Sequence, residues 1–161
     1  MRRRDFIASI SAVATWPLST RAQQQQEGVR QVGILLPFSE TDVESRVHLD
    51  ILRKRLNELG WTENRNVRIA IRYGAGNTER MRNLAKELVA MKPDVILSRS
   101  TPSTKSILNE TKSIPTIFVV VSDPVGDGII SSIARPGGNV TGFTNVEASL
   151  GGKWLEVLNL P

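Results

Sequence analysis

Short apolar runs alternate with helix-patterned segments from residue 31 onward, and this alternation limits the folds open to the chain. The runs at 31–36, 94–97 and 116–121 are compact and apolar, as expected for strands buried on both faces. The run at 67–72 has one more polar face, which favours a position at the edge of a sheet. Strands alternating with helices predict a doubly wound α/β domain, with a parallel sheet of about five strands covered on both sides.

The helical segments follow from spacing and capping residues. The first carries a predicted inner stripe made of Val43, Val47, Ile51, Leu52, Leu56 and Leu59. The second is capped by Asn77 or Thr78, and its predicted inner stripe consists of Met81, Leu84, Leu88 and Met91. In full, the sequence predicts strands at 31–36, 67–72, 94–97, 116–121 and 139–143, and helices at 42–59, 79–91, 103–112, 127–134 and 149–159.

Residues 1–22 have the pattern of an export signal. Three arginines precede a short apolar stretch, and Thr20 and Ala22 provide the small residues expected before a cleavage site. The opening around Arg3 and Arg4 is similar to a twin-arginine signal. The alternative is an amphipathic or buried first helix, but Pro17 disfavours it and the apolar run is too short to span a bilayer. We therefore expect a polar linker at 23–30 and a domain that works in the periplasm.

Composition narrows the function further. Residues 1–22 hold four arginines and one aspartate, so the remaining chain keeps 17 basic and 15 acidic residues and a net charge of +2 instead of +5. The basic balance is thus no evidence for nucleic-acid binding. With no cysteine and one histidine, His48, the chain offers few ligands for a metal and no thiol nucleophile. We interpret His48 as a solvated or hydrogen-bonded helix residue.

Catalytic motifs give no positive signal. The chain carries no glycine-rich phosphate loop before the first helix, no nucleophile elbow and no zinc-binding helix motif. Asp123 stands alone at a strand end, whereas magnesium sites and acid–base pairs usually need a second carboxylate. We predict a protein that is not an enzyme and needs no cofactor.

Polar side chains follow four of the predicted strands. Because ligands of doubly wound sheets bind at the carboxyl ends of the strands, hydroxyls, an amide and a carboxylate at those ends suit a small polar or zwitterionic solute. The alternative for each residue alone is that it caps a helix. The predicted ligand-binding residues are Ser39, Ser100, Thr101, Asp123, Thr144 and Asn145.

Several segments also match a known family. Residues 123–126 read Asp-Pro-Val-Gly and residues 135–142 read Arg-Pro-Gly-Gly-Asn-Val-Thr-Gly, and further segments match in order between residues 30 and 158. Together they closely resemble the substrate-binding proteins of ABC importers, in the subgroup associated with tryptophan or other aromatic amino acids. The resemblance implies one lobe of a type I periplasmic binding fold, in which two lobes close on a ligand and a membrane permease recognises the closed state.

The resemblance also defines the expected domains and partners. It places an N-terminal lobe at 31–146 and the start of a crossover helix toward a second lobe at 147–161. It implies that Ser39, Ser100 and Thr101 donate to a carboxylate or another polar group, that Asp123 meets an amine or organises its loop, and that Thr144 and Asn145 lie near the hinge. A small-molecule ligand, an ABC permease and a monomeric state are expected.

Two departures from the family qualify these expectations. Arg99 stands where the family has a small uncharged residue, so it is a candidate partner for an anion. The family is also much longer than this chain, so the sequence represents a fragment or a truncated gene. The alternative function is a one-lobe α/β protein that binds no solute.

Overall fold

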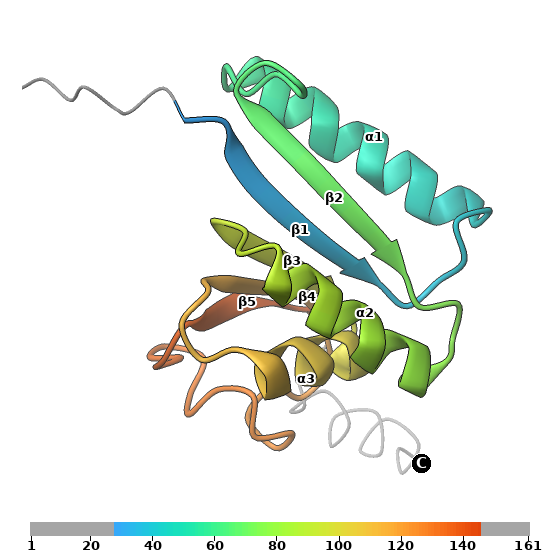
Figure 1. Cartoon of the computed structure of the whole chain (residues 1–161). Helices are drawn as coiled ribbons and strands as arrows, with labels where there is room; N and C mark the ends of the chain where they lie inside the picture. Colours follow the sequence, from blue (N-terminus) through green and yellow to red (C-terminus); the bar gives the residue numbers. More distant parts are fainter. Residues whose placement is uncertain (1–27, 146–161) are drawn as a thin grey trace, which may run out of the picture.

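A five-stranded parallel sheet forms the centre of the computed structural model, which describes residues 28–145. The strands lie in the order β2-β1-β3-β4-β5, and all neighbours are parallel. Their bounds are β1 Arg30–Leu36, β2 Val67–Tyr73, β3 Val95–Arg99, β4 Thr116–Val121 and β5 Val140–Thr144 (Figure 1). The predicted strands are confirmed, and β2 lies at the sheet edge as its polar face indicated.

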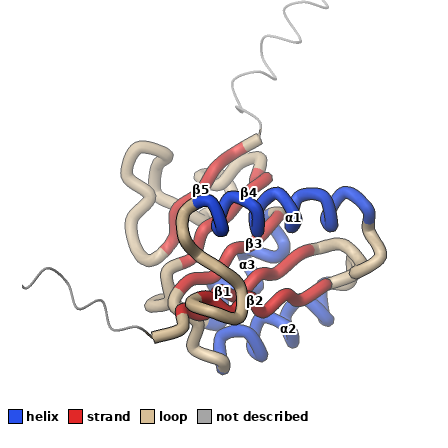
Figure 2. Tube along the Cα trace, turned by 90° about the horizontal axis from the view of Figure 1, so that it is seen from above, coloured by secondary structure: helices blue, strands red, loops and turns tan. Residues whose placement is uncertain are grey.

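Three helices cover the two faces of this sheet. Helix α1 (Val43–Glu58) lies on one face, and α2 (Thr78–Ala90) and α3 (Thr101–Glu110) lie side by side on the other (Figure 2). The chain moves from β1 outward to β2 and then back across β1 to β3, and right-handed crossovers in opposite directions place their helices on opposite faces. The doubly wound prediction is therefore confirmed, and the strand order reverses between β1 and β3.

Strand β1 supplies both cores because its side chains alternate between the two faces. Ile34 and Leu36 pack with Leu49 of α1 on one face. Leu35 packs on the other face with side chains of α2, α3 and β3. Ile34 and Leu35 are completely buried, so the compact apolar run of the sequence corresponds to a strand enclosed on both sides.

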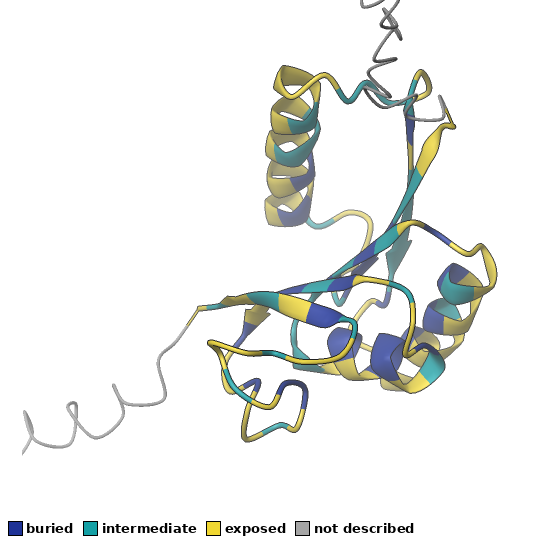
Figure 3. Ribbon diagram, turned by 90° about the vertical axis from the view of Figure 1, so that its left-hand side faces the viewer, coloured by how far each residue is buried: buried dark blue, intermediate teal, exposed yellow. Residues whose placement is uncertain are grey.

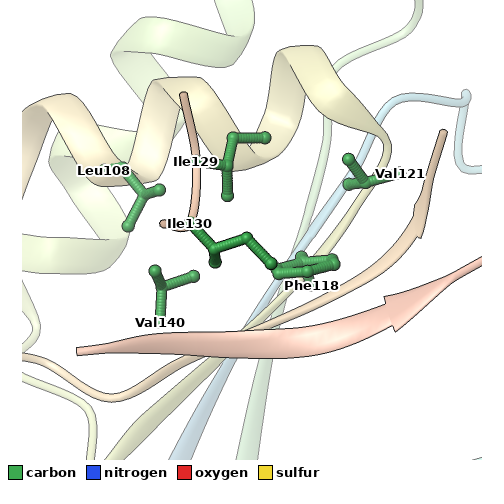
Figure 4. Close-up of a cluster of buried hydrophobic side chains, with 6 residues drawn as sticks. All are labelled: Leu108, Phe118, Val121, Ile129, Ile130 and Val140. Atoms are coloured by element: carbon green, nitrogen blue, oxygen red, sulfur yellow. The ribbon is translucent and has the colours of Figure 1, made fainter. Parts of the chain in front are cut away.

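A further apolar cluster joins α3 to β4, β5 and the segment at 129–130. Figure 4 shows Phe118 of β4 packed close to Ile130, while the whole cluster consists of Leu108, Phe118, Val121, Ile129, Ile130 and Val140. Gly142 of β5 passes so close to Phe118 that an added Cβ would lie 2.1 Å from the Phe118 carbonyl oxygen. This contact requires glycine at position 142, because any side chain there would push the two strands apart.

The predicted inner stripe of α1 is partly wrong. Ser45 and Leu49 face the sheet, while Val43, Val47 and Ile51 are exposed, as is Leu59 just after the helix. Figure 3 shows a narrow buried strip on α1 and more extensive buried surfaces on the two helices of the opposite face. Leu52 and Leu56 of the predicted set are partly buried, and Leu52 packs against the cluster around Leu49. Apolar residues occupy both sides of α1, so spacing alone also selected residues of the exposed side. In α2 the stripe is confirmed at Met81 and Leu88, with Leu84 partly buried, but Met91 lies beyond the helix and is exposed.

The predicted short helix at 127–134 is also wrong, because this segment forms turns. The Asp123 carboxylate accepts a hydrogen bond from the N–H of Gly126 at 2.8 Å, and Gly128 adopts a positive φ of 69°. These features bend the chain back before a helical turn can repeat. The predicted helix at 149–159 lies outside the described residues.

The two sides of α1 provide a test of the corrected packing. Leu49→Ala should lower the free energy of unfolding by about 2–4 kcal/mol because it empties buried apolar volume. Ile51→Ala should change it by less than about 0.5 kcal/mol because Ile51 is exposed. Urea unfolding of both variants measures the difference. A larger loss for Ile51→Ala would restore the stripe expected from spacing.

Asp94 ties the start of β1 to the loop before β3. Its carboxylate accepts hydrogen bonds from the Gln31 N–H and from the Arg30 guanidinium, both at 2.7 Å. The Gln31 bond, followed by the Arg30 bond, lowers the pKa of Asp94 below its ordinary value. The ionised form is therefore favoured in the folded state.

Acid should remove this contribution. A carboxyl whose folded pKa is lowered stabilises the protein above its unfolded pKa of about 4 and loses that effect as the pH falls through the folded value. Urea unfolding should show Asp94→Asn as less stable than wild type at pH 7, with the gap closing below about pH 4. Asp50→Asn is the matched control, because it removes a longer, 3.5 Å ion pair with Arg53 on the surface of α1. A gap that stays constant with pH would contradict the assignment.

Candidate functional site

The predicted site residues all follow strands that end at the same edge of the sheet. Ser39 comes after β1, Ser100 and Thr101 after β3, and Asp123 after β4. Thr144 ends β5 and Asn145 follows it. Since β1, β3, β4 and β5 are parallel neighbours, their carboxyl ends lie next to one another. Ser39 and Ser100 flank the place where the strand order reverses, which is where ligands of such sheets bind.

Ser100 and Thr101 form the start of α3. Helix α3 begins two residues earlier than the sequence indicated, so Thr101 is its first residue and Ser100 its N-cap. The Ser100 hydroxyl accepts a long 3.5 Å hydrogen bond from the Ser103 N–H, and Ser100 has a φ of 85°. The capping role expected for such a serine is present, and the positive φ marks a strained turn beside the sheet edge.

The loop after β1 leads into α1 through a second capping group. The Ser39 hydroxyl lies 3.0 Å from the Thr41 hydroxyl, and the Asp42 carboxylate accepts a 2.8 Å hydrogen bond from the Ser45 N–H. Hydrogen bonding from Ser45 lowers the pKa of Asp42, and the nearby positive charge of Arg99 acts in the same direction. Asp42 thus fixes the helix start close to Ser39.

Asp123 organises its own loop. Its carboxylate receives the Gly126 N–H, and its carbonyl oxygen receives the Asp127 N–H at 2.9 Å. Of the two roles that the sequence left open, loop organiser is the one for which the structure provides contacts. Lys105 of α3 reaches the same loop, with its ammonium 2.6 Å from the Asp127 carboxylate.

Arg99 joins three elements in a way that the sequence did not reveal. Its guanidinium donates to the Glu44 carboxylate at 2.9 Å and to the His48 Nδ1 at 3.1 Å, both on α1. The same group lies over the ring of Phe38, 4.8 Å from the centroid. Arg99 was expected to be a partner for an anion, and that anion is the side chain of Glu44. His48 is hydrogen-bonded, as one of its two expected roles required.

Two hollows in the described part of the chain lie near opposite ends of the strands. A cavity of about 250 Å³ lies between α1 and the sheet, with Leu36, Arg99, Val119 and Val120 at its walls. A hollow of about 320 Å³ lies at the opposite, amino ends of β1 and β2, near Gln31. Neither hollow is lined by any of the six predicted ligand-binding residues.

Neither a metal-binding cluster nor a membrane-spanning helix is present among the described residues. Within 28–145, no cluster of three or more histidine, cysteine, aspartate or glutamate side chains is arranged to hold a metal ion. Among the helices in the same range, none combines the length and the apolar character that a bilayer span requires.

The chain is similar in sequence to a curated protein and in structure to several solved proteins. A tyrosine-binding protein of Clostridioides difficile strain R20291 is 36% identical over 92 residues, which are 57% of this chain and 27% of the relative. A ligand-free, open substrate-binding protein with adhesive properties from Clostridium difficile superposes with a TM-score of 0.69 at 26% identity. That match covers 80% of this chain and 43% of the other.

A second solved structure contains a bound amino acid. It is an ABC domain from Streptococcus pneumoniae in complex with L-Trp, with a TM-score of 0.61 and 28% identity over 71% of this chain and 38% of the other. The chain thus spans less than half the length of the relatives it matches.

The family model described as ABC transporter substrate binding protein matches residues 32–151, which include every described strand and helix after the first two residues of β1. The family match, the sequence relative and both structural neighbours point to the same kind of protein. This chain belongs to the ABC transporter substrate-binding protein family.

Proposed function

We propose that this chain provides one side of the ligand cleft of an extracytoplasmic solute-binding protein that serves an ABC importer. The observation that carries the proposal is the row of polar residues at the carboxyl ends of four adjacent parallel strands, in a member of this family. Such an edge offers hydroxyl and backbone donors beside the N-terminus of α3, where an anionic group is stabilised.

Amino acids are the solute class that fits best. A solute carboxylate would lie near Ser39, Ser100 and Thr101, and Thr144 and Asn145 would contact it from the far strand. Asp123 would act mainly through its loop, given its hydrogen bonds there. One named relative binds tyrosine and one solved neighbour holds L-Trp, which supports an amino acid and favours an aromatic one.

The same proposal assigns roles to the rest of the chain. Residues 1–22 direct export to the periplasm by a twin-arginine-like signal, and residues 23–30 link them to the lobe at 31–146. Residues 147–161 lead toward a second lobe, which closes over the solute so that a permease in the inner membrane recognises the closed form. The protein works as a monomer and performs no chemistry on its solute.

Affinity measurements test this half-cleft. A solute held by a single lobe leaves about half of its surface in water, so binding by the 161-residue chain should be measurable only at millimolar concentrations. Isothermal titration with a panel of amino acids would detect micromolar binding. Ligand-detected NMR would detect binding as weak as millimolar. Micromolar binding would contradict the half-cleft. No response at 10 mM, on the order of the weakest measurable affinities, would favour a one-lobe protein that binds no solute.

A further inference from the structure

Phe38 and Arg99 meet at the point where the strand order reverses. Phe38 is in the loop after β1, directly before Ser39, and Arg99 ends β3, directly before Ser100. Their side chains touch, with the guanidinium carbon 4.8 Å from the ring centroid. Each member of the pair is therefore the chain neighbour of a serine that the proposed function assigns to the solute carboxylate.

Arg99 is held in place from the side of α1. Glu44 and His48 accept its N–H groups at 2.9 and 3.1 Å, and only 14% of its side-chain surface is exposed. A guanidinium bound in this way cannot turn toward a solute anion without breaking both contacts. Its remaining planar face can stack on an aromatic ring, which is a geometry that arginine favours.

Phe38 remains accessible, with 36% of its surface exposed. Phe38 is a large apolar side chain next to the predicted ligand-binding hydroxyls, and its ring is held by the cation beneath it. A ring that is already held in position loses little conformational freedom when a flat apolar group packs on it. Such a ring distinguishes an aromatic side chain of the solute from a saturated one, because a flat ring with a quadrupole packs on it better.

We propose that Phe38 is the residue that selects an aromatic side chain of the solute, and that Arg99 is a positioning residue that holds the Phe38 ring. This inference rests on the proposed function, because it places the solute at the same edge. It assigns to the lobe itself a share of the selectivity for aromatic amino acids. The anionic end of the solute is left to the hydroxyls and to the start of α3.

The test compares L-phenylalanine with L-cyclohexylalanine, which has a saturated ring of similar size. NMR titration of the 161-residue chain should give wild type a preference for L-phenylalanine of about two- to tenfold. Phe38→Leu should abolish that preference, whereas Phe38→Tyr should retain it. Because Phe38 is partly exposed, both variants should fold, and thermal unfolding verifies this.

The role of Arg99 needs a matched control. Arg99→Met should reduce the preference for L-phenylalanine, while Arg53→Met should leave it unchanged. Arg53 forms a similar ion pair on α1, 3.0 Å from Glu63, but it lies near the other end of the helix. Arg99→Lys should restore part of the preference, since lysine keeps a cation beneath the ring but not the planar fork.

The outcomes separate this inference from the proposed function. Wild type that binds both compounds equally, or a preference that survives in Phe38→Leu, would overturn the inference and leave the proposed function standing. Equal losses in Arg99→Met and Arg53→Met would reduce Arg99 to a general structural role and overturn its assignment. Binding of neither compound would overturn the proposed function and this inference with it.

Discussion

The central position of β1 is the constraint on which the rest of the structure depends. This strand pairs with β2 over its whole length and with β3 along its middle, and its side chains enter the cores on both faces. Both neighbours run parallel to it, so each must be reached through a helix, and right-handed crossovers place α1 opposite α2 and α3. One strand thereby determines which face each helix covers. It also determines the place where the strand order reverses.

The same constraint explains why the candidate site lies where it does. Parallel strands direct their carboxyl ends to one edge, so loops far apart in the sequence meet there. Residues 38 and 99 are 61 positions apart, yet they are in contact because β1 and β3 are neighbours. Two helix starts lie beside this contact, one capped by Asp42 and the other by Ser100. The edge combines donors, a strained turn and one fixed aromatic ring, which together suit recognition of a small amphipathic molecule.

Features that depend on local pattern were predictable, and features that depend on pairing were not. The alternation of strands and helices predicted the five strands, and the more polar face of β2 predicted its edge position. Capping preference predicted Asn77 or Thr78 at the start of α2, and Asn77 is the cap, because its side chain accepts the Arg80 N–H. Spacing failed for α1 because Val43, Val47 and Ile51 lie opposite the side that contains Leu49. It failed at 127–134 because a carboxylate three residues before Gly126 stabilises a turn instead. The hydrogen bond between Arg99 and Glu44 was not predictable, because the two residues are 55 positions apart and only the fold brings them together.

We propose above that the carboxyl edge between β1 and β3 is the surface that receives the solute. Amide chemical-shift mapping of the 161-residue chain with millimolar L-tryptophan tests it directly. We expect the largest changes at the amides of Ser39, Ser100 and Thr101, and smaller ones at Thr144 and Asn145. Changes concentrated around Gln31 and Arg68, beside the hollow at the opposite edge, would contradict it.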